Sequence, residues 1–158
     1  MLRRNWKLYG FWIILCEAVG LVSGWLSREG IAVYNATAVK PPFTPPSWVF
    51  PVVWTILFAL MGISAAKVSL SETSNAKSRG LNLFIAQLIV NFFWPLFFFN
   101  LQVFGFAFFW LILLWILVFA TIIVFWKVDQ RAAWLLVPYL VWLTFAAVLN
   151  GAVWVLNS

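Results

Sequence analysis

Long apolar stretches alternate with short polar segments along most of the chain. About 20 consecutive apolar residues are enough to cross a bilayer as a helix. Five stretches meet this requirement, at about residues 6–26, 47–68, 81–100, 104–126 and 132–155. The pattern therefore predicts an all-α membrane protein, a five-transmembrane-helix bundle in which residues 1–158 form a single domain.

The third and fourth stretches form one long run, and only a few uncharged turn-forming residues separate them. No charged residue occurs between Leu81 and Trp126, a run that is long enough for two helices. Asn100, Gln102 and Gly105 are turn-forming residues near its middle, and they predict where the chain reverses. The first stretch is too long for the core of a cleavable signal peptide, so we expect it to stay as a membrane helix.

The amino-acid composition is that of a membrane protein, and it excludes some kinds of covalent link and catalytic site. The chain is 65% hydrophobic and 9% charged, whereas soluble domains have about 25% charged residues. It has one cysteine and no histidine, which excludes an internal disulfide and a Ser-His-Asp triad. Its 12 Trp and 17 Phe leave two interpretations open, a ring-lined cavity or rings that face lipid.

The basic residues are distributed unevenly over the predicted loops. The N-terminus, the second loop and the fourth loop together carry Arg3, Arg4, Lys7, Lys67, Lys77, Arg79, Lys127 and Arg131. The opposite side carries only Arg28 and Lys40. The positive-inside rule then predicts a cytoplasmic N-terminus and an outside C-terminus, and we expect no nucleic-acid partner. Because no transit peptide is visible, we expect a prokaryotic plasma membrane.

The first loop, about residues 27–46, ends in a proline-rich segment. Four prolines at Pro41, Pro42, Pro45 and Pro46 fix φ and forbid helix there, and Ser47 is a plausible N-cap for the next helix. A stiff segment of this kind is suited to cover a cavity, because little entropy is lost when it is held in place. A rigid connector without a ligand is the alternative.

Polar side chains and prolines recur on faces of the predicted helices. On the third helix, Gln87, Asn91, Trp94 and Phe98 lie at helical spacing. The two amides must point inward, either as hydrogen-bonding links between helices or as polar groups of a pocket. Faces of the second and fifth helices combine aromatic residues in the same way, and Pro95 and Pro138 predict kinks.

Glu17 is the one charged residue deep inside a predicted span. A carboxylate at membrane depth is expensive, so it indicates function by default. The alternative is a neutral, buried carboxyl group that is hydrogen-bonded to a neighbouring side chain.

Three blocks of sequence combine prolines, aromatic residues and amides at fixed spacing. The first is Lys40-Pro-Pro-Phe-Thr-Pro-Pro-Ser-Trp-Val-Phe-Pro-Val-Val-Trp54-Thr. The others run from Ala86 to Phe99 (Gln-Leu-x-x-Asn-x-x-Trp) and from Leu135 to Asn150 (Pro-Tyr-x-x-Trp-x-x-Phe-Ala-x-x-Leu-Asn). Together they resemble the TspO/MBR family of tryptophan-rich sensory and translocator proteins. Two features depart from the family pattern. Val33-Tyr34 stands where members commonly carry Trp-Tyr, and the animal cholesterol-recognition segment is absent after Asn150.

The resemblance implies a homodimer in the lipid bilayer, with a cavity that binds porphyrins such as protoporphyrin IX or haem as ligand, no cofactor being required. It implies that the cavity is lined by Tyr34, Pro45, Trp54, Asn91, Trp94, Phe98, Trp142, Phe145, Ala146 and Leu149. Trp54 and Trp142 match the pair that members are thought to use in light-dependent porphyrin breakdown. A tetrapyrrole sensor or carrier is the main hypothesis, and a porphyrin-degrading enzyme or a ligand-free scaffold are the alternatives.

Overall fold

The computed structural model describes residues 2–158, and it is helical nearly throughout. The helices are α1 (Leu2–Leu26), α2 (Arg28–Thr37), α3 (Val49–Ser69), α4 (Asn75–Pro95), the π-helical turn η1 (Leu96–Asn100), α5 (Phe104–Val128) and α6 (Gln130–Leu156). Five segments are long and apolar enough to cross a membrane, namely Asn5–Leu26, Val49–Ser69, Asn75–Asn100, Phe104–Val128 and Gln130–Leu156. The predicted five-helix membrane bundle is confirmed.

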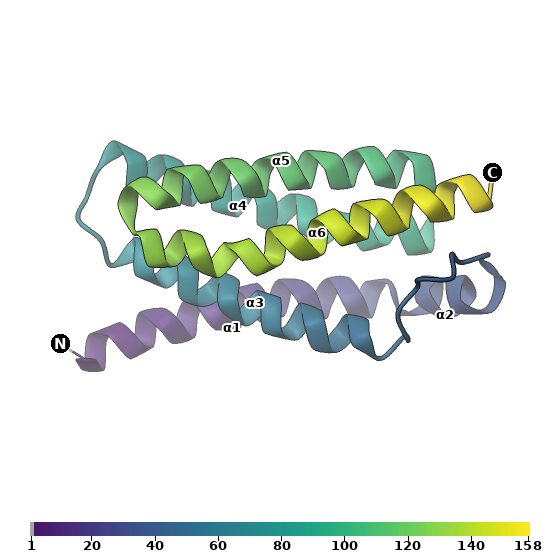
Figure 1. The fold of residues 1–158 in the computed structure, drawn as a ribbon. Coiled ribbons are helices and arrows are strands. Elements are labelled where there is room, and N and C mark those ends of the chain that lie inside the picture. The colour runs from purple at the N-terminus through teal and green to yellow at the C-terminus, as the bar shows by residue number, and fades with distance from the viewer. Residues whose placement is uncertain (1) are drawn as a thin grey trace.

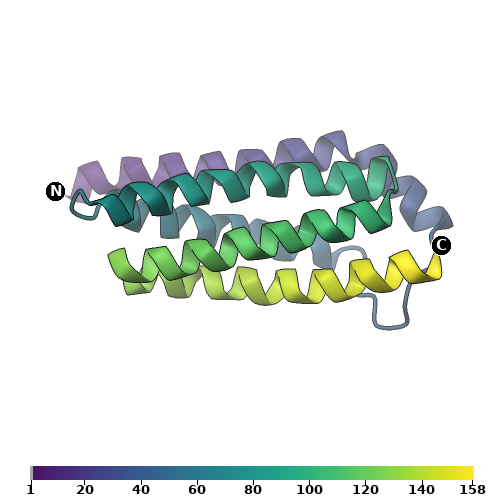
Figure 2. The same cartoon turned by 90° about the horizontal axis from the view of Figure 1, so that it is seen from above.

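The long helices run side by side, and the two termini lie at opposite ends of the bundle (Figure 1). The connections after α3 and α5 lie at the end where the chain begins, whereas α2 and the proline-rich loop lie at the other end with the C-terminus (Figures 1 and 2). Lys67, Lys77 and Lys127 therefore lie at the same end of the bundle as the N-terminus. This is the arrangement that the uneven distribution of basic residues predicts.

Side-chain caps start two of the spanning helices. The Ser74 hydroxyl accepts a hydrogen bond from the Lys77 backbone nitrogen (3.1 Å), so α4 begins well before the apolar stretch expected from residue 81. The Asp129 carboxylate accepts hydrogen bonds from the backbone nitrogens of Arg131 (2.9 Å) and Ala132 (3.3 Å). Both caps satisfy amides that the first helical turn leaves unpaired. The boundaries predicted from hydrophobicity were too short because polar residues form the ends of these helices.

The prediction that Ser47 caps the N-terminus of helix α3 was wrong. Helix α3 begins at Val49 after Trp48, and no side chain caps it. The backbone nitrogen of Val49 instead donates to the carbonyl of Pro46 at 3.0 Å, which closes a turn within the proline-rich loop. A backbone turn thus delivers the chain into α3 without help from a hydroxyl group.

The sequence did not predict helix α2. Prolines forbid helix only from Pro41 onward, so the ten residues from Arg28 remain free to form one. Gly30 lets α2 approach η1 closely, because a Cβ atom at Gly30 would lie 2.7 Å from the Asn100 backbone nitrogen. The Asn100 side chain also donates a hydrogen bond to the Leu26 carbonyl (3.0 Å), which fixes η1 against the end of α1.

Pro95 marks a change in helical geometry. Proline has no N–H, so the carbonyl of Asn91 loses its helical partner, and α4 continues as the wider turn η1. The chain then reverses through Gln102, whose φ of 51° is left-handed, as the turn-forming residues predicted. The irregular stretch after Pro95 brings Phe98 and Phe99 toward α2.

Candidate ligand cavity

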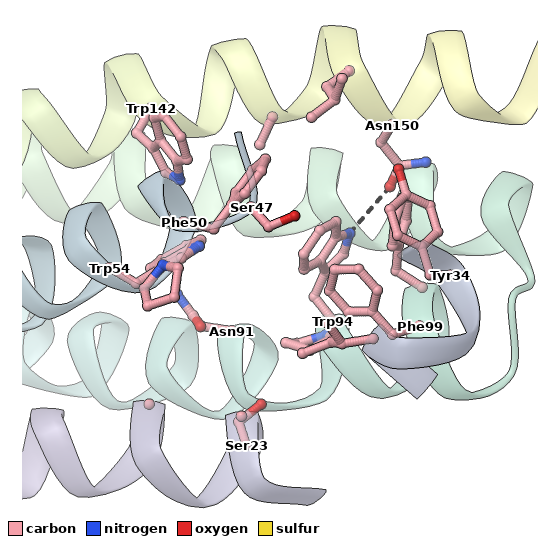
Figure 3. A pocket seen from close by; sticks show the side chains of 18 of the residues that line it. Ser23, Tyr34, Ser47, Phe50, Trp54, Asn91, Trp94, Phe99, Trp142 and Asn150 are labelled. Atoms are coloured by element: carbon pink, nitrogen blue, oxygen red, sulfur yellow. Dashed lines mark hydrogen bonds between the residues drawn. The ribbon is translucent and has the colours of Figure 1, made fainter. Parts of the chain in front are cut away.

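A cavity of about 640 Å³ lies inside the end of the bundle that α2 and the proline-rich loop cover. All five long helices contribute to its wall (Figure 3). Pockets for small molecules usually measure about 300–1,000 Å³, so the cavity is large enough for a sizeable ligand. The loop supplies Lys40, Thr44, Pro45, Pro46 and Ser47 to the lining, so this segment covers the cavity rather than only connecting two helices.

Nearly all the residues that the family resemblance implies for the site come together around this cavity. They are Tyr34, Pro45, Trp54, Asn91, Trp94, Phe98, Trp142, Ala146 and Leu149. Phe145 does not line the cavity. Its ring packs edge-on against Phe43 (6.4 Å between centroids) and is tilted against Trp142 (5.4 Å). Phe145 therefore supports Trp142 and the loop from behind.

Aromatic rings form two sides of the cavity. Trp54 and Trp142 lie on one side, and Trp94 and Phe99 lie on the other (Figure 3). Trp94 stacks on Phe98 with centroids 4.9 Å apart and planes at 24°. Opposed flat rings of this kind favour a flat, apolar ligand that they can contact face to face.

The polar pair on α4 has a structural function and also contributes to the cavity. Asn91 Nδ2 donates to the Tyr139 hydroxyl (2.6 Å), and that hydroxyl donates to Gln87 Oε1 (2.7 Å). Gln87 Nε2 reaches the Met61 sulfur at 3.9 Å, so the network links α3, α4 and α6. Gln87 is confined to this network, whereas Asn91 also lines the cavity. Gln87 is therefore a link between helices only, whereas Asn91 is such a link and also a polar group of the cavity wall.

A second polar link positions the ring of Trp94. Its indole nitrogen donates to Asn150 Oδ1 at 3.1 Å (Figure 3). Asn150 Nδ2 in turn donates to the Phe104 carbonyl at 2.9 Å, so one amide joins α4, α5 and α6. The Trp142 indole nitrogen, in contrast, is shielded from solvent and has no hydrogen-bond partner in the part of the chain that the structure describes. This donor is therefore unpaired and enclosed by the surrounding side chains.

Tyr34 joins α2 to the cavity. Its ring lies 5.1 Å from Phe98 and 5.2 Å from Phe99, and the Lys40 ammonium lies 5.1 Å from its centroid. Burial raises the pKa of Tyr34 to about 12, because the charged phenolate is disfavoured away from water. Lys40 also donates to the Asn35 carbonyl at 3.1 Å, which holds the ammonium group at this edge of the cavity.

The proline-rich loop, which together with α2 covers the cavity, is hydrogen-bonded to the C-terminal end of the chain after α6. Asn157 Oδ1 accepts from the Val39 backbone nitrogen (3.0 Å), and Asn157 Nδ2 donates to the Val39 carbonyl (2.8 Å). One side-chain amide therefore pairs with both backbone groups of a loop residue, as a neighbouring strand would do. This contact holds the start of the proline-rich loop in place over the cavity.

The lining contributed by α1 was missed. Gly20, Ser23 and Gly24 line the cavity, together with Glu17 on the same helix. Their spacing of three and four residues places them on one helical face, and small residues on such a face leave room beside it. This spacing of small residues could have predicted from the sequence that α1 lines the cavity. Glu17 is half-buried on the cavity wall, and the expected hydrogen bond from its carboxyl group to a neighbouring side chain is not formed within the described residues.

Comparison with known proteins agrees with this architecture. The sequence model that describes the TspO/MBR family matches residues 12–155 of this chain. The chain belongs to the TspO/MBR family. It is 39% identical to protein CrtK of Rhodobacter capsulatus over 151 residues, which cover 95% of this chain and 92% of that protein. It is 40% identical to tryptophan-rich protein TspO of Chlorobaculum tepidum over 144 residues (90% and 91%).

The similarity extends to animal proteins. The chain is 35% identical to the translocator protein of Ovis aries over 147 residues, which cover 92% of this chain and 86% of that one. The five apolar helices and the bacterial relatives identify an integral membrane protein. Membership of the TspO/MBR family supports a role as a membrane sensor or transporter.

Proposed function

We propose that this protein is a membrane sensor or carrier that binds tetrapyrroles, such as protoporphyrin IX or haem, in the aromatic cavity. The observation that carries the proposal is the opposition of Trp54 and Trp142 to Trp94 across a cavity of about 640 Å³. A macrocycle is a broad, flat π-system, and stacking on indole rings needs no metal ligand from the protein. The absence of histidine from the sequence is therefore compatible with the proposal.

Polar groups at the cavity edge suit the remaining parts of a porphyrin. Lys40, in the cover, is the basic residue that lines the cavity, and it is the natural partner for a propionate. Arg28, the other basic residue at this end, stacks on Trp25 instead (4.1 Å) and does not line the cavity. The Asn91 amide, which lines the cavity, supplies a contact for a polar atom of the ligand.

A titration of the purified protein with protoporphyrin IX in the dark tests the proposal. The absorption band of the porphyrin is the readout, because twelve tryptophans would blur any signal from protein fluorescence. We expect a saturable shift with one porphyrin per chain. A linear, unsaturable change would mean that the porphyrin only dissolves in the detergent micelle, and the proposal would fail.

Light-dependent porphyrin breakdown is a second candidate, because Trp54 and Trp142 line the same cavity. Illumination of the complex should then give a product that is absent in darkness and absent in a Trp54→Phe, Trp142→Phe double variant, which keeps two aromatic rings for stacking. Porphyrin loss that proceeds equally in the double variant would remove this candidate and leave plain binding.

Assembly and orientation also belong to the proposal. We propose a homodimer, which light scattering in detergent would test by its mass. We propose an N-terminus in the cytoplasm of a prokaryotic cell. A Ser158→Cys variant should then be labelled by an impermeant reagent from outside, and labelling only from the cytoplasm would reverse the topology.

A further inference from the structure

Two charged side chains, Glu17 and Lys40, occur among the residues that line the cavity, within the part of the chain that the structure describes. They lie at different depths. Lys40 belongs to the cover, whereas Glu17 lies nine residues before Leu26, about 14 Å along helix α1. The cavity thus has a positive edge near the cover and a negative group further inside the bundle.

Glu17 is the acidic side chain among the described residues that line the cavity, and its carboxylate has no partner there. The hydroxyls of Ser23 and Thr55 each donate to a main-chain carbonyl (2.7 Å), and the Asn150 amide is also bonded. In the described residues, no salt bridge or hydrogen bond is formed by the Glu17 carboxylate. A carboxylate at membrane depth without a partner is costly, so a ligand that supplies one would be favoured.

The surroundings of Glu17 leave space for such a ligand. Gly24 follows it two turns later on α1, and a Cβ atom there would meet nothing within 4 Å, whereas the Phe58 ring packs against Gly20, nearer to Glu17. The rings of Trp54, Trp94 and Trp142 line the same cavity, and aromatic faces attract cations as well as flat rings. A carboxylate and indole rings on the wall of one cavity can together attract a cationic aromatic molecule, the carboxylate by its charge and the rings by cation–π contact.

We propose that Glu17 is the counter-charge for a protonated amine, so that the cavity selects flat aromatic cations over neutral molecules of the same shape. Glu17 would also repel carboxylates, so an acidic ligand would be oriented with its carboxylates toward Lys40. This inference rests on the proposed function, since it takes the same cavity as the ligand site. It adds the charge class that the site selects.

The test compares two probes of nearly equal shape, 9-aminoacridine, which is a cation at pH 8, and acridine, which is neutral. Each is titrated into the protein in an uncharged maltoside detergent, with the probe's own fluorescence as readout. We expect the wild-type protein to bind 9-aminoacridine at least tenfold more tightly, as one charge-assisted hydrogen bond allows. The Glu17→Gln variant should lose this preference while acridine affinity changes less than twofold.

Glu29→Gln is the matched control, because Glu29 is exposed on α2 and does not line the cavity. It should keep the full preference for 9-aminoacridine. Equal affinity of the wild-type protein for the two probes, or a preference that survives in Glu17→Gln, would overturn the inference. If protoporphyrin IX still binds saturably in that case, the proposed function stands and only the charge selection fails. If no probe binds saturably, both fail.

Discussion

The Tyr139 hydroxyl accepts a hydrogen bond from Asn91 Nδ2 at 2.6 Å and donates its own proton to Gln87 at 2.7 Å. All three side chains are buried at membrane depth. One phenol therefore satisfies two amides of α4 from its place on α6. The hydrogen-bond network fixes the rotation of α4, and with it the side of the helix that carries Asn91 and Trp94 toward the cavity.

Tyr139→Phe tests this network. Removal of the hydroxyl leaves two buried amide groups without their partner, which we expect to lower the free energy of unfolding by about 1–3 kcal/mol. Thermal unfolding in detergent measures the effect. Tyr9→Phe is the control, because no hydrogen bond from the Tyr9 hydroxyl is formed within the described residues, and it should unfold near the wild-type temperature. Equal melting of all three proteins would show that the network contributes no stability.

Gly30→Ala tests the close contact between α2 and η1. The new Cβ atom would lie 2.7 Å from the Asn100 backbone nitrogen, so α2 must move away and carry Tyr34 with it. We expect a loss of about 1–3 kcal/mol in stability, together with weaker porphyrin binding. Gly10→Ala is the matched control, since its Cβ would meet nothing within 4 Å and alanine favours helix. Unchanged behaviour of Gly30→Ala would contradict the described packing of α2.

The hydrogen bonds of Asn157 to Val39 predict how the cover responds to a single change. Asn157→Ala removes both bonds to the loop, so the Val39 amide should exchange its hydrogen faster, by at least tenfold. Hydrogen exchange followed by mass spectrometry of the peptide that contains residues 38–47 measures this. Ser158→Ala, a change at the neighbouring exposed residue, should leave the exchange rate unaltered. Equal rates in both variants would mean that the loop is held by other contacts.

The pH dependence of stability follows from Tyr34. Its folded-state pKa is about 12 and its ordinary value is 10.0, so folding favours the neutral phenol. The contribution is fully present below about pH 10 and is lost as the pH rises through 12. Unfolding measured between pH 8 and pH 12 should therefore show a steeper loss of stability in the wild-type protein than in Tyr34→Phe. Parallel curves would show that Tyr34 is not buried from water.

The sequence predicted the five spans because each is a run of apolar residues that only lipid can cover. It did not predict α2, because a short helix of mixed polarity has no such signature and the neighbouring prolines suggested an extended loop. The partner of Gln87 and Asn91 was also out of reach. Spacing showed that the two amides share a face of α4, but it contains no information on which residue of another helix faces them.

The prediction of the cavity lining shows the same limit. Family motifs on α3, α4 and α6 identified residues that do meet around one cavity. Phe145 was included because it matches a position of the family motif, but α6 turns the face of Trp142, Ala146 and Leu149 to the cavity and places Phe145 beside Phe43. The part of the wall formed by α1 was missed because small residues were not read as lining.

The measurement that tests the central claim most directly compares two double variants in the dark titration with protoporphyrin IX. Trp54→Ala with Trp142→Ala removes two rings from the cavity, whereas Trp126→Ala with Trp134→Ala removes two exposed rings that do not line it. We predict that the first variant loses the saturable shift and that the second keeps it with an affinity within about twofold of wild type. Retention of full affinity by the first variant would show that porphyrin does not bind in this cavity.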